Sequence, residues 1–418
     1  MKRRDFVGTT LVAAGAAMIP GAAIASARRA AEPVIRVGVI GCGGRGIGAA
    51  MNLLEASPFV HVVALADVFV DRLKAGREHL ASRGERSSVA EHRCFTGFDA
   101  YKKLLREPVD LVVLATPPHF RPMHFEAAVQ AGVHVFMEKP VAVDAPGVRR
   151  VLEAAQQAKD AKRSVVAGTQ RRYERVYLEA LQRVRDGQIG EIVGASCYWN
   201  MGGLWKADRR PEWSDMEWQL RNWLYFTWLS GDHIVEQHVH NLDVINWFLN
   251  DTPAQCLGMG GRQVRISPDY GHIYDHFAIE YEYQSGVSMT SFCRQIDGCD
   301  GRVQERIRGT KGTLVIQPGW ARITGEKPWQ FTGENNNPYV DEQRRLVESI
   351  LSGEPINDAF DVAHSTLTAV MGRLSAYTGK NVSWDQAMNS SEDLSPPAYA
   401  FGPLPTPPVP MPGRTPLL

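Results

Sequence analysis

The stretch GDHIVEQHVHNLD, from Gly231 to Asp243, contains three histidines and three carboxylates in thirteen residues. Side chains of these types can ligate a metal ion, exchange protons with a substrate, or form the solvated face of a helix. HxxE followed by xxxH could supply three metal ligands, but the spacing is not that of the HExxH zinc motif. Nothing else in the chain supports a metal site, so we expect none.

A continuous helix would align four of these side chains. A helix turns by about 100° per residue, which places His233, Glu236, His240 and Asp243 on one narrow face. The apolar residues point largely elsewhere and can pack against a core: Ile234, Val235, Val239, Leu242, Ile245 and Leu249. His233 and His238 (the latter off this face) fit a solvated surface as well as they fit any function.

A glycine-rich run, Gly41-Cys42-Gly43-Gly44-Arg45-Gly46, follows the strand-like PVIRVGVIG and opens a helical pattern. This context predicts a dinucleotide-binding loop. Gly41 would permit the tight turn, Gly43 the approach of a pyrophosphate, and Gly46 close packing of helix against strand. Gly44 and Arg45 lie at the helix N-terminus, whose N–H groups favour phosphates. The alternative is a glycine-rich loop without a ligand.

Asp67 ends the next strand, twenty-one residues after Gly46. A carboxylate at this point accepts hydrogen bonds from the adenosine ribose hydroxyls and repels a 2′-phosphate. We therefore expect NAD as the cofactor. NADP stays possible because Arg72 lies five residues further on.

Further polar residues follow other predicted parallel strands, where open α/β sheets bind their ligands. We expect Thr116, Pro117, His119, Glu138 and Lys139 to contact the cofactor. Lys139 is also placed to handle a substrate proton beside the nicotinamide. Residues after a further strand end are candidate substrate contacts: Arg171, Arg172 and Tyr173.

The order of predicted elements gives the domain organisation. Strands and helices alternate over residues 31–160, which predicts an α/β Rossmann domain with a doubly wound parallel sheet. Over residues 161–395 the strands alternate in polarity or pair through glycine-containing turns, which predicts an α+β domain with a large, mainly antiparallel open sheet. Residues 396–418 contain nine prolines and can form neither helix nor central strand. They form either an extended arm or a disordered tail.

The first thirty residues have the pattern of a targeting segment. Arg3-Arg4 precedes an apolar run and a small-residue cleavage site, Ala25-Ser26-Ala27, as in a twin-arginine (Tat) signal peptide. The alternative, a membrane anchor, would need a longer run with less Gly and Ala. We expect a periplasmic or extracellular protein without a stable membrane span. The formal net charge is zero, so nothing suggests a nucleic-acid partner.

The quoted segments together resemble the glucose–fructose oxidoreductase/inositol dehydrogenase (Gfo/Idh/MocA) family, from about Val34 to about Trp384. AGVHVFMEKP, residues 131–140, is the most specific of them. The resemblance implies a bound nicotinamide cofactor, a sugar or polyol substrate, no metal, and homo-oligomers formed through the C-terminal sheet. It implies that Lys139, Glu236 and His240 are catalytic, with Asp243 at the substrate.

Two positions depart from the family pattern, and both leave the substrate open. Glu236 stands where the family usually has aspartate, and Arg121 stands where it usually has histidine. Six tryptophans precede the histidine-rich segment and would form either a sugar platform or a lid with its own core: Trp199, Trp205, Trp213, Trp218, Trp223 and Trp228.

The expected function is that of an exported oxidoreductase, which transfers a hydride from a sugar or polyol to a tightly bound nicotinamide cofactor. Little free NAD is available for exchange outside the cytoplasm, so an exported enzyme would have to reoxidise its cofactor in place. One alternative is an NAD-dependent glycoside hydrolase that oxidises its sugar transiently. Another is a sugar-binding protein with a structural dinucleotide.

Overall fold

The computed structural model describes residues 33–418, and Val34–Leu418 form one compact unit. The predicted signal peptide lies outside the described residues, so it stays a prediction, as does the boundary between the two predicted domains. No helix in the described part of the chain is both long and apolar enough to cross a membrane.

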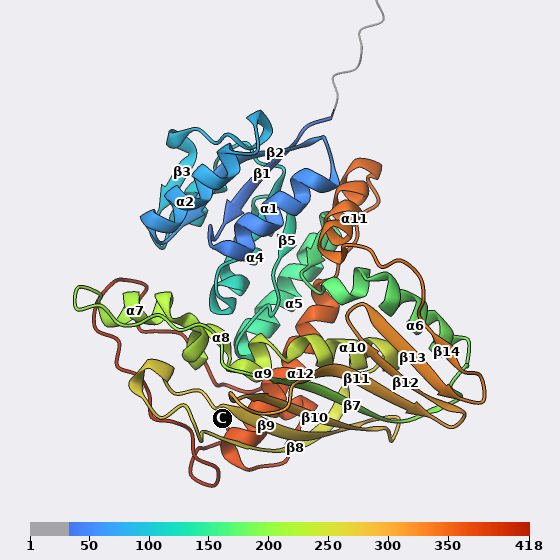
Figure 1. Ribbon diagram of the computed structural model, residues 1–418. Coiled ribbons are helices and arrows are strands. Elements are labelled where there is room, and N and C mark those ends of the chain that lie inside the picture. The colour runs from blue at the N-terminus through green and yellow to red at the C-terminus, as the bar shows by residue number, and fades with distance from the viewer. Residues whose placement is uncertain (1–32) are drawn as a thin grey trace, which may run out of the picture. The chain divides into compact units, whose positions relative to one another are not determined.

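The N-terminal part of the described chain forms a six-stranded parallel sheet (Figure 1), in the order β3-β2-β1-β4-β5-β6. This is the doubly wound order of dinucleotide-binding folds, and it confirms the Rossmann prediction. Its strands are β1 (Ile35–Ile40), β2 (Val60–Asp67), β3 (Cys94–Thr96), β4 (Leu111–Leu114), β5 (His134–Met137) and β6 (Val165–Ala167). The three-residue β3 was not predicted, because it is too short to show a pattern.

Helices connect these strands and cover the sheet. They are α1 (Gly44–Ala56), α2 (Val70–Ala81), α3 (Ala100–Leu104), α4 (Arg121–Gln130) and α5 (Ala145–Asp160). The strands are buried on both faces, which explains their continuous runs of Val, Ile, Leu and Ala.

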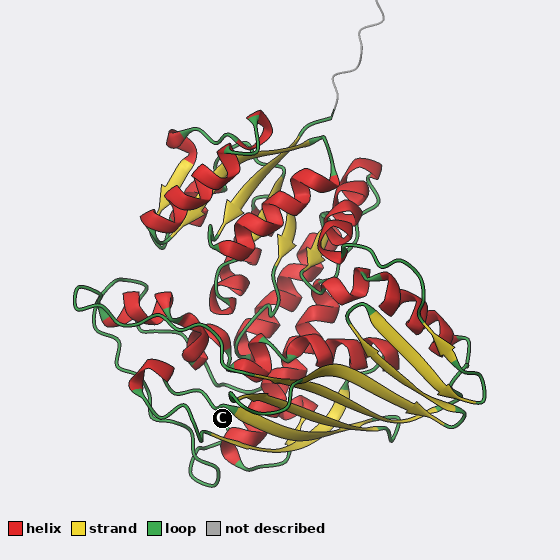
Figure 2. Ribbon diagram, viewed as in Figure 1, coloured by secondary structure: helices red, strands yellow, loops and turns green. Residues whose placement is uncertain are grey.

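A nine-stranded sheet forms the other layer (Figure 2), in the order β14-β13-β12-β11-β7-β10-β9-β8-β15. Only β7 and β10 pair in parallel, so the prediction of a mainly antiparallel sheet is confirmed. The strands are β7 (Ile192–Met201), β8 (Pro253–Gly261), β9 (His276–Tyr283), β10 (Ser288–Gln295), β11 (Arg302–Gly309), β12 (Gly312–Gln317), β13 (Trp320–Gly325), β14 (Trp329–Gln330) and β15 (Val382–Ser383).

Helices α10 (Val239–Leu249) and α12 (Ala359–Thr378) pack on one face of this sheet. The strands alternate accordingly, and β9 for example has every second side chain buried. The remaining helices are α6 (Arg175–Arg185), α7 (Asp215–Arg221), α8 (Thr227–Ser230), α9 (His233–Glu236), α11 (Pro338–Ser352) and α13 (Trp384–Met388).

The histidine-rich segment is not one continuous helix. Helix α9 ends at Glu236, and α10 begins at Val239. His238 lies between them, fully buried, with its Nε2 2.7 Å from the Ser291 hydroxyl of the sheet. The helix is interrupted at Gln237 and His238, so the continuous helix assumed for the common polar face does not form.

Residues 396–418 form neither helix nor strand, as predicted, and they lie extended against the rest of the chain. The Tyr274 hydroxyl donates a hydrogen bond to the Pro410 carbonyl at 2.9 Å, and the Gly413 N–H donates to the Thr378 carbonyl at 2.9 Å. Of the two alternatives left by the sequence, the structure shows the extended arm.

Candidate active site

The glycine-rich loop has the geometry that its residues predicted. Gly41 has a φ of +96°, and a Cβ there would lie 2.7 Å from the Ala115 carbonyl carbon. A Cβ on Gly46 would lie 1.8 Å from the Gly41 carbonyl oxygen, so only glycine lets α1 pack this closely. A Cβ on Gly44 would meet nothing within 4 Å. The loop therefore leaves open space beside the free N–H groups of a helix N-terminus, which suits a phosphate group.

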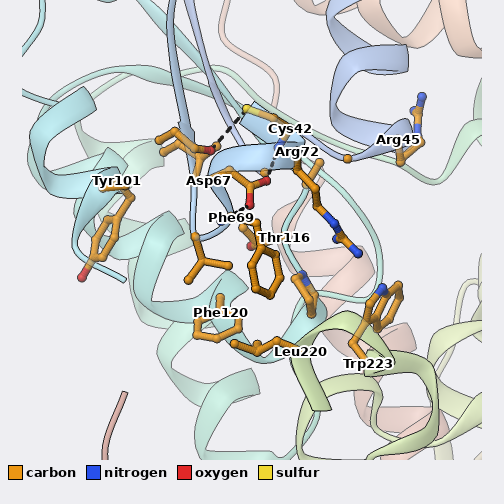
Figure 3. Close-up of a pocket in the computed structure, with 18 of the residues that line it drawn as sticks. Cys42, Arg45, Asp67, Phe69, Arg72, Tyr101, Thr116, Phe120, Leu220 and Trp223 are labelled. Carbon is orange, nitrogen blue, oxygen red and sulfur yellow. Dashed lines mark hydrogen bonds between the residues drawn. The ribbon is translucent and has the colours of Figure 1, made fainter. Parts of the chain in front are cut away.

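A cavity of about 620 Å³ opens in front of this loop (Figure 3), a size that suits a cofactor. Its lining includes seven residues expected to bind the cofactor: Gly41, Gly43, Gly44, Arg45, Asp67, Thr116 and Pro117. The Asp67 carboxylate accepts hydrogen bonds from the N–H groups of Cys42 at 2.7 Å and Phe69 at 2.8 Å. Burial raises the pKa of Asp67 above its ordinary value. The cavity fits a dinucleotide lying on the loop and on Asp67.

The rest of the cavity lining consists largely of apolar residues, of which the sequence had singled out only Trp205 and Trp223. Phe69, Phe98 and Phe120 come from the Rossmann side, and Arg72 lies beside Phe69. Trp205, Leu220 and Trp223 come from residues 204–228, here called the cover segment. Figure 3 shows Leu220 and Trp223 across the cavity from Asp67. The density of tryptophans was the only signal in the sequence for this wall.

Arg121 links the two strand ends beside the cavity. It is fully buried, and its guanidinium donates to the carbonyls of Glu138 and Thr116, both at 2.8 Å. Burial lowers its pKa to about 10. Arg121 therefore holds the end of β4, which lines the cavity, against the end of β5, which leads to Lys139. The residue that departs from the family pattern has a positioning role here.

Lys139, two residues after the end of β5, contacts Glu236, the last residue of α9. Its ammonium donates to the Glu236 carbonyl at 2.5 Å and to the Glu236 carboxylate at 3.2 Å. Both side chains are nearly buried, with 10% and 9% exposed. The other carboxylate oxygen accepts from the Gln237 amide. The structure thus brings together a cation and a carboxylate that were predicted to share a site.

His240 lies near this pair at the start of α10. Its ring stacks on Trp199, with ring centres 5.7 Å apart, and the Arg171 guanidinium lies 5.6 Å from the same indole. Burial, with Lys139, Arg171 and Arg45 as cationic neighbours, lowers the pKa of His240 well below its ordinary value. The imidazole is therefore neutral at neutral pH, and the same surroundings disfavour its protonated form.

Glu138 and Arg45, both predicted to contact the cofactor, pair with each other. Arg45 also donates to Glu342 of α11 at 3.1 Å and lies over the Tyr339 ring at 5.0 Å. The ion pair ties the glycine-rich loop to β5 and α11. Glu138 itself does not line the cavity.

The predicted substrate residues have internal partners. Arg172 forms a two-bonded ion pair with Asp243, both bonds at 2.9 Å. Arg171 pairs with buried Glu305, and the Tyr173 hydroxyl donates to Asp358 at 2.5 Å. None of the four lines the large cavity. Their contacts with a substrate stay a prediction.

His119 is buried and lies outside the cavity lining, with its Nε2 2.8 Å from the Tyr399 hydroxyl of the arm. Burial lowers its pKa to about 4. In residues 33–418, no group of three or more histidine, cysteine, aspartate or glutamate side chains is arranged to hold a metal ion. The candidate site thus consists of the cavity together with Lys139, Glu236 and His240.

The fold and the glycine-loop cavity are those of a Rossmann-fold oxidoreductase, and comparison with known families gives the same class. Residues 35–189 match the oxidoreductase family with an NAD-binding Rossmann fold, GFO/IDH/MocA. Residues 177–315 match the C-terminal domain of that family. The chain belongs to the GFO/IDH/MocA family, as the resemblance in its sequence predicted.

The relatives are distant. An inositol 2-dehydrogenase of Acidothermus cellulolyticus is 26% identical over 71% of this chain and 78% of its own. A 2,7-anhydro-N-acetylneuraminate hydratase of Escherichia coli is 28% identical over 59% of this chain and 62% of its own. A glycosyl hydrolase family 109 protein of Streptomyces coelicolor is 32% identical over 39% of this chain and 34% of its own. The chain thus spans less than two thirds of the latter two relatives.

Among solved structures, the aldose-aldose oxidoreductase of Caulobacter crescentus superposes with a TM-score of 0.67. The match covers 84% of this chain and 99% of that one at 20% identity. The apo scyllo-inositol dehydrogenase of Lactobacillus casei has a TM-score of 0.65 with the same coverage and identity. At this identity the two structures establish the fold.

The buried histidines predict a loss of stability in acid. Burial lowers the pKa of four from 6.5 to about 3 or 4: His119, His124, His238 and His272. Partial burial lowers that of the half-buried His134 to about 4. Between pH 6.5 and 4 the unfolded chain therefore binds more protons, and each fully buried histidine costs roughly 1.4 kcal/mol per pH unit as the pH falls. Asp232 and Glu305, with pKa values raised to about 6 and about 7, oppose this in part.

We expect the urea midpoint of unfolding to fall steadily from pH 6.5 to pH 4.5. His134→Asn removes one titrating histidine but keeps its hydrogen bond. An amide oxygen can still accept from the Ser164 N–H, which lies 2.9 Å from His134 Nδ1. This variant should show a shallower pH dependence. A midpoint that is constant over this range would contradict the expectation.

Proposed function

We propose that this protein oxidises a sugar or polyol hydroxyl by hydride transfer to a nicotinamide dinucleotide held in the large cavity. The observation that carries the proposal is the contact of Lys139 with Glu236, 2.5 and 3.2 Å. Arg121 links this contact to the cavity, because it bonds to the carbonyls of Glu138, next to Lys139, and of Thr116 in the cavity lining. The inositol dehydrogenase relative supports a polyol or sugar as the substrate class.

The chain's own residues would handle the proton. The Lys139 ammonium can donate to the reacting hydroxyl and stabilise the developing alkoxide. The hydroxyl proton would pass to the neutral imidazole of His240 and on to solvent, because the surroundings of His240 disfavour a lasting imidazolium. Glu236 holds Lys139 in place. A bound nicotinamide ring supplies the hydride acceptor. Arg121 fixes the position of Lys139 relative to the cavity, because it bonds to the carbonyls of Glu138 and Thr116.

We propose NAD as the dinucleotide. Support comes from Asp67 at the end of β2 in the cavity lining, where a carboxylate would disfavour a 2′-phosphate. Arg72 also lines the cavity and could pair with a 2′-phosphate, so binding of NAD and NADP should be compared directly.

We also propose export by a Tat signal and assembly into homo-oligomers. The first proposal is supported by the sequence of residues 1–30 alone. The second is supported by apolar side chains exposed on the nine-stranded sheet: Val193, Leu257, Met259 and Phe292. Light scattering of the purified protein tests the oligomer.

The deciding experiment is to purify the protein, identify any nucleotide that co-purifies, and assay free sugars, polyols and nitrophenyl glycosides in parallel. Formation of NADH, or dismutation of a sugar pair, supports the proposed oxidoreductase. Release of nitrophenol without net NADH would replace it with a glycoside hydrolase. Failure to bind either dinucleotide would refute the cofactor and the function together.

A further inference from the structure

The C-terminal arm (residues 396–418) contacts the Rossmann side of the cofactor cavity through aromatic side chains. The Tyr399 hydroxyl lies 2.8 Å from His119 Nε2. Phe401 stacks on Phe69 with ring centres 6.1 Å apart and lies 5.3 Å from Phe98. Phe69 and Phe98 line the cavity. The arm therefore packs directly behind two of the cavity's wall residues.

The same stretch of arm is bound to the cover segment. The Leu404 N–H donates to the Asp215 carboxylate at 3.0 Å, and the Gln219 amide donates to the Leu404 carbonyl at 2.6 Å. The Met216 N–H donates to the Gly402 carbonyl at 3.1 Å. Arm residues 399–404 thus join α7 to the Rossmann side within six residues.

The arm reinforces a weaker direct contact between the two walls. Arg221 at the end of α7 forms an ion pair with Asp71 at 2.9 Å, but Asp71 is 64% exposed. An exposed ion pair of this kind contributes little. Arg221 also lies 3.9 Å from the centre of the Phe69 ring. The buried part of the connection is one apolar cluster that includes Phe69, Phe120, Trp223, Tyr399 and Leu404.

The arm is anchored on both sides of this stretch. Before it, the Leu394 N–H donates to Asp144 at 3.0 Å. After it, Pro410 and Gly413 are bonded to the C-terminal layer, and the Leu418 carbonyl accepts from the Ser390 hydroxyl at 2.6 Å. The many prolines restrict the backbone before binding, so little conformational entropy is lost when the arm is held extended.

We propose that Tyr399 and Phe401 are positioning residues that hold the two walls of the cofactor cavity together, so that the dinucleotide stays bound from one turnover to the next. A ligand enclosed between walls leaves only when they separate, and such contacts act mainly on the dissociation rate. This inference rests on the proposed function. It fits an enzyme that must regenerate its cofactor in place.

The test compares the double variant Tyr399→Phe/Phe401→Ala with Val409→Ala on the same arm. Phe401 and Val409 are both partly exposed, at 49% and 38%, but Phe401 packs on the cavity residues Phe69 and Phe98. Each protein is loaded with NAD, and release is followed after addition of excess isotopically labelled NAD. We expect release from the double variant to be about tenfold faster or more, with an increased KM for NAD and little change in kcat at saturation. Val409→Ala should match the wild type.

Release rates that agree within twofold in all three proteins would overturn the role of the arm. A wild type that binds no dinucleotide would instead overturn the proposed function, so the two failures are distinguishable. If the double variant does not fold, Phe401→Leu, which keeps an apolar side chain against Phe69, takes its place with the same expected direction. Thermal unfolding without NAD separates loss of retention from general destabilisation.

Discussion

Lys139→Ala is expected to lower turnover by about 10²- to 10⁴-fold while the Kd for NAD stays within a few-fold of the wild type. Lys139 contacts Glu236 and is absent from the cavity lining. Its loss should therefore affect the proton and the alkoxide more than the dinucleotide. Steady-state kinetics on the best substrate of the sugar panel, together with equilibrium titration of NAD, measure the two effects.

The alanine variant also leaves the Glu236 carboxylate without its cation in a nearly buried place. The double variant Lys139→Ala/Glu236→Gln controls for this, since it removes the unpaired carboxylate together with its cation. Lys103→Ala, at an exposed ion pair with Asp99, is a control for general loss of a lysine. Equal losses in turnover and NAD binding would refute the catalytic role of Lys139.

Gly46→Ala should weaken NAD binding by about 10- to 100-fold and lower the melting temperature. The added methyl would lie 1.8 Å from the Gly41 carbonyl oxygen and 3.2 Å from the Ala115 side chain, so α1 must move away from β1. That movement displaces the N–H groups that face the phosphates. Isothermal titration measures the Kd for NAD, and thermal unfolding with and without NAD measures the change in melting temperature.

Gly48→Ala is the matched control two residues further along α1. A Cβ there would meet only the flexible end of the Arg45 side chain, at 3.8 Å. Alanine is the better helix former by about 1 kcal/mol, so this variant should be as stable as the wild type or more stable and should bind NAD normally. Normal NAD binding by Gly46→Ala would contradict the packing role assigned to that glycine.

Much of the fold could be predicted because its signals are local. A buried parallel strand shows as a continuous apolar run, and the turn after β1 requires glycine at Gly41 and Gly46, whatever surrounds them. The antiparallel sheet was predicted from three strands that alternate or pair through tight turns. Strands β8, β11, β12 and β13 were not predicted individually, and neither were the short strands β3, β14 and β15, in which two or three residues carry no periodicity.

The arrangement of the histidine-rich segment could not be predicted. The helical spacing of His233, Glu236, His240 and Asp243 assumed a continuous helix. The buried contact of His238 with Ser291, fifty-three residues away, interrupts it. Long-range packing outweighs local helical propensity here. As a result Glu236 faces Lys139, whereas Asp243 pairs with Arg172.

By itself, the sequence determined the class of fold, the family, the glycine-rich loop and the residue types available for proton transfer, because each depends on neighbours in the chain. Only the tertiary structure decided which partners those residues have. It placed Lys139 against Glu236, enclosed Arg121 between two strand ends, and laid the proline-rich arm across both walls of the cavity. These contacts join segments about twenty to more than three hundred residues apart, and the chain has no local pattern that records them.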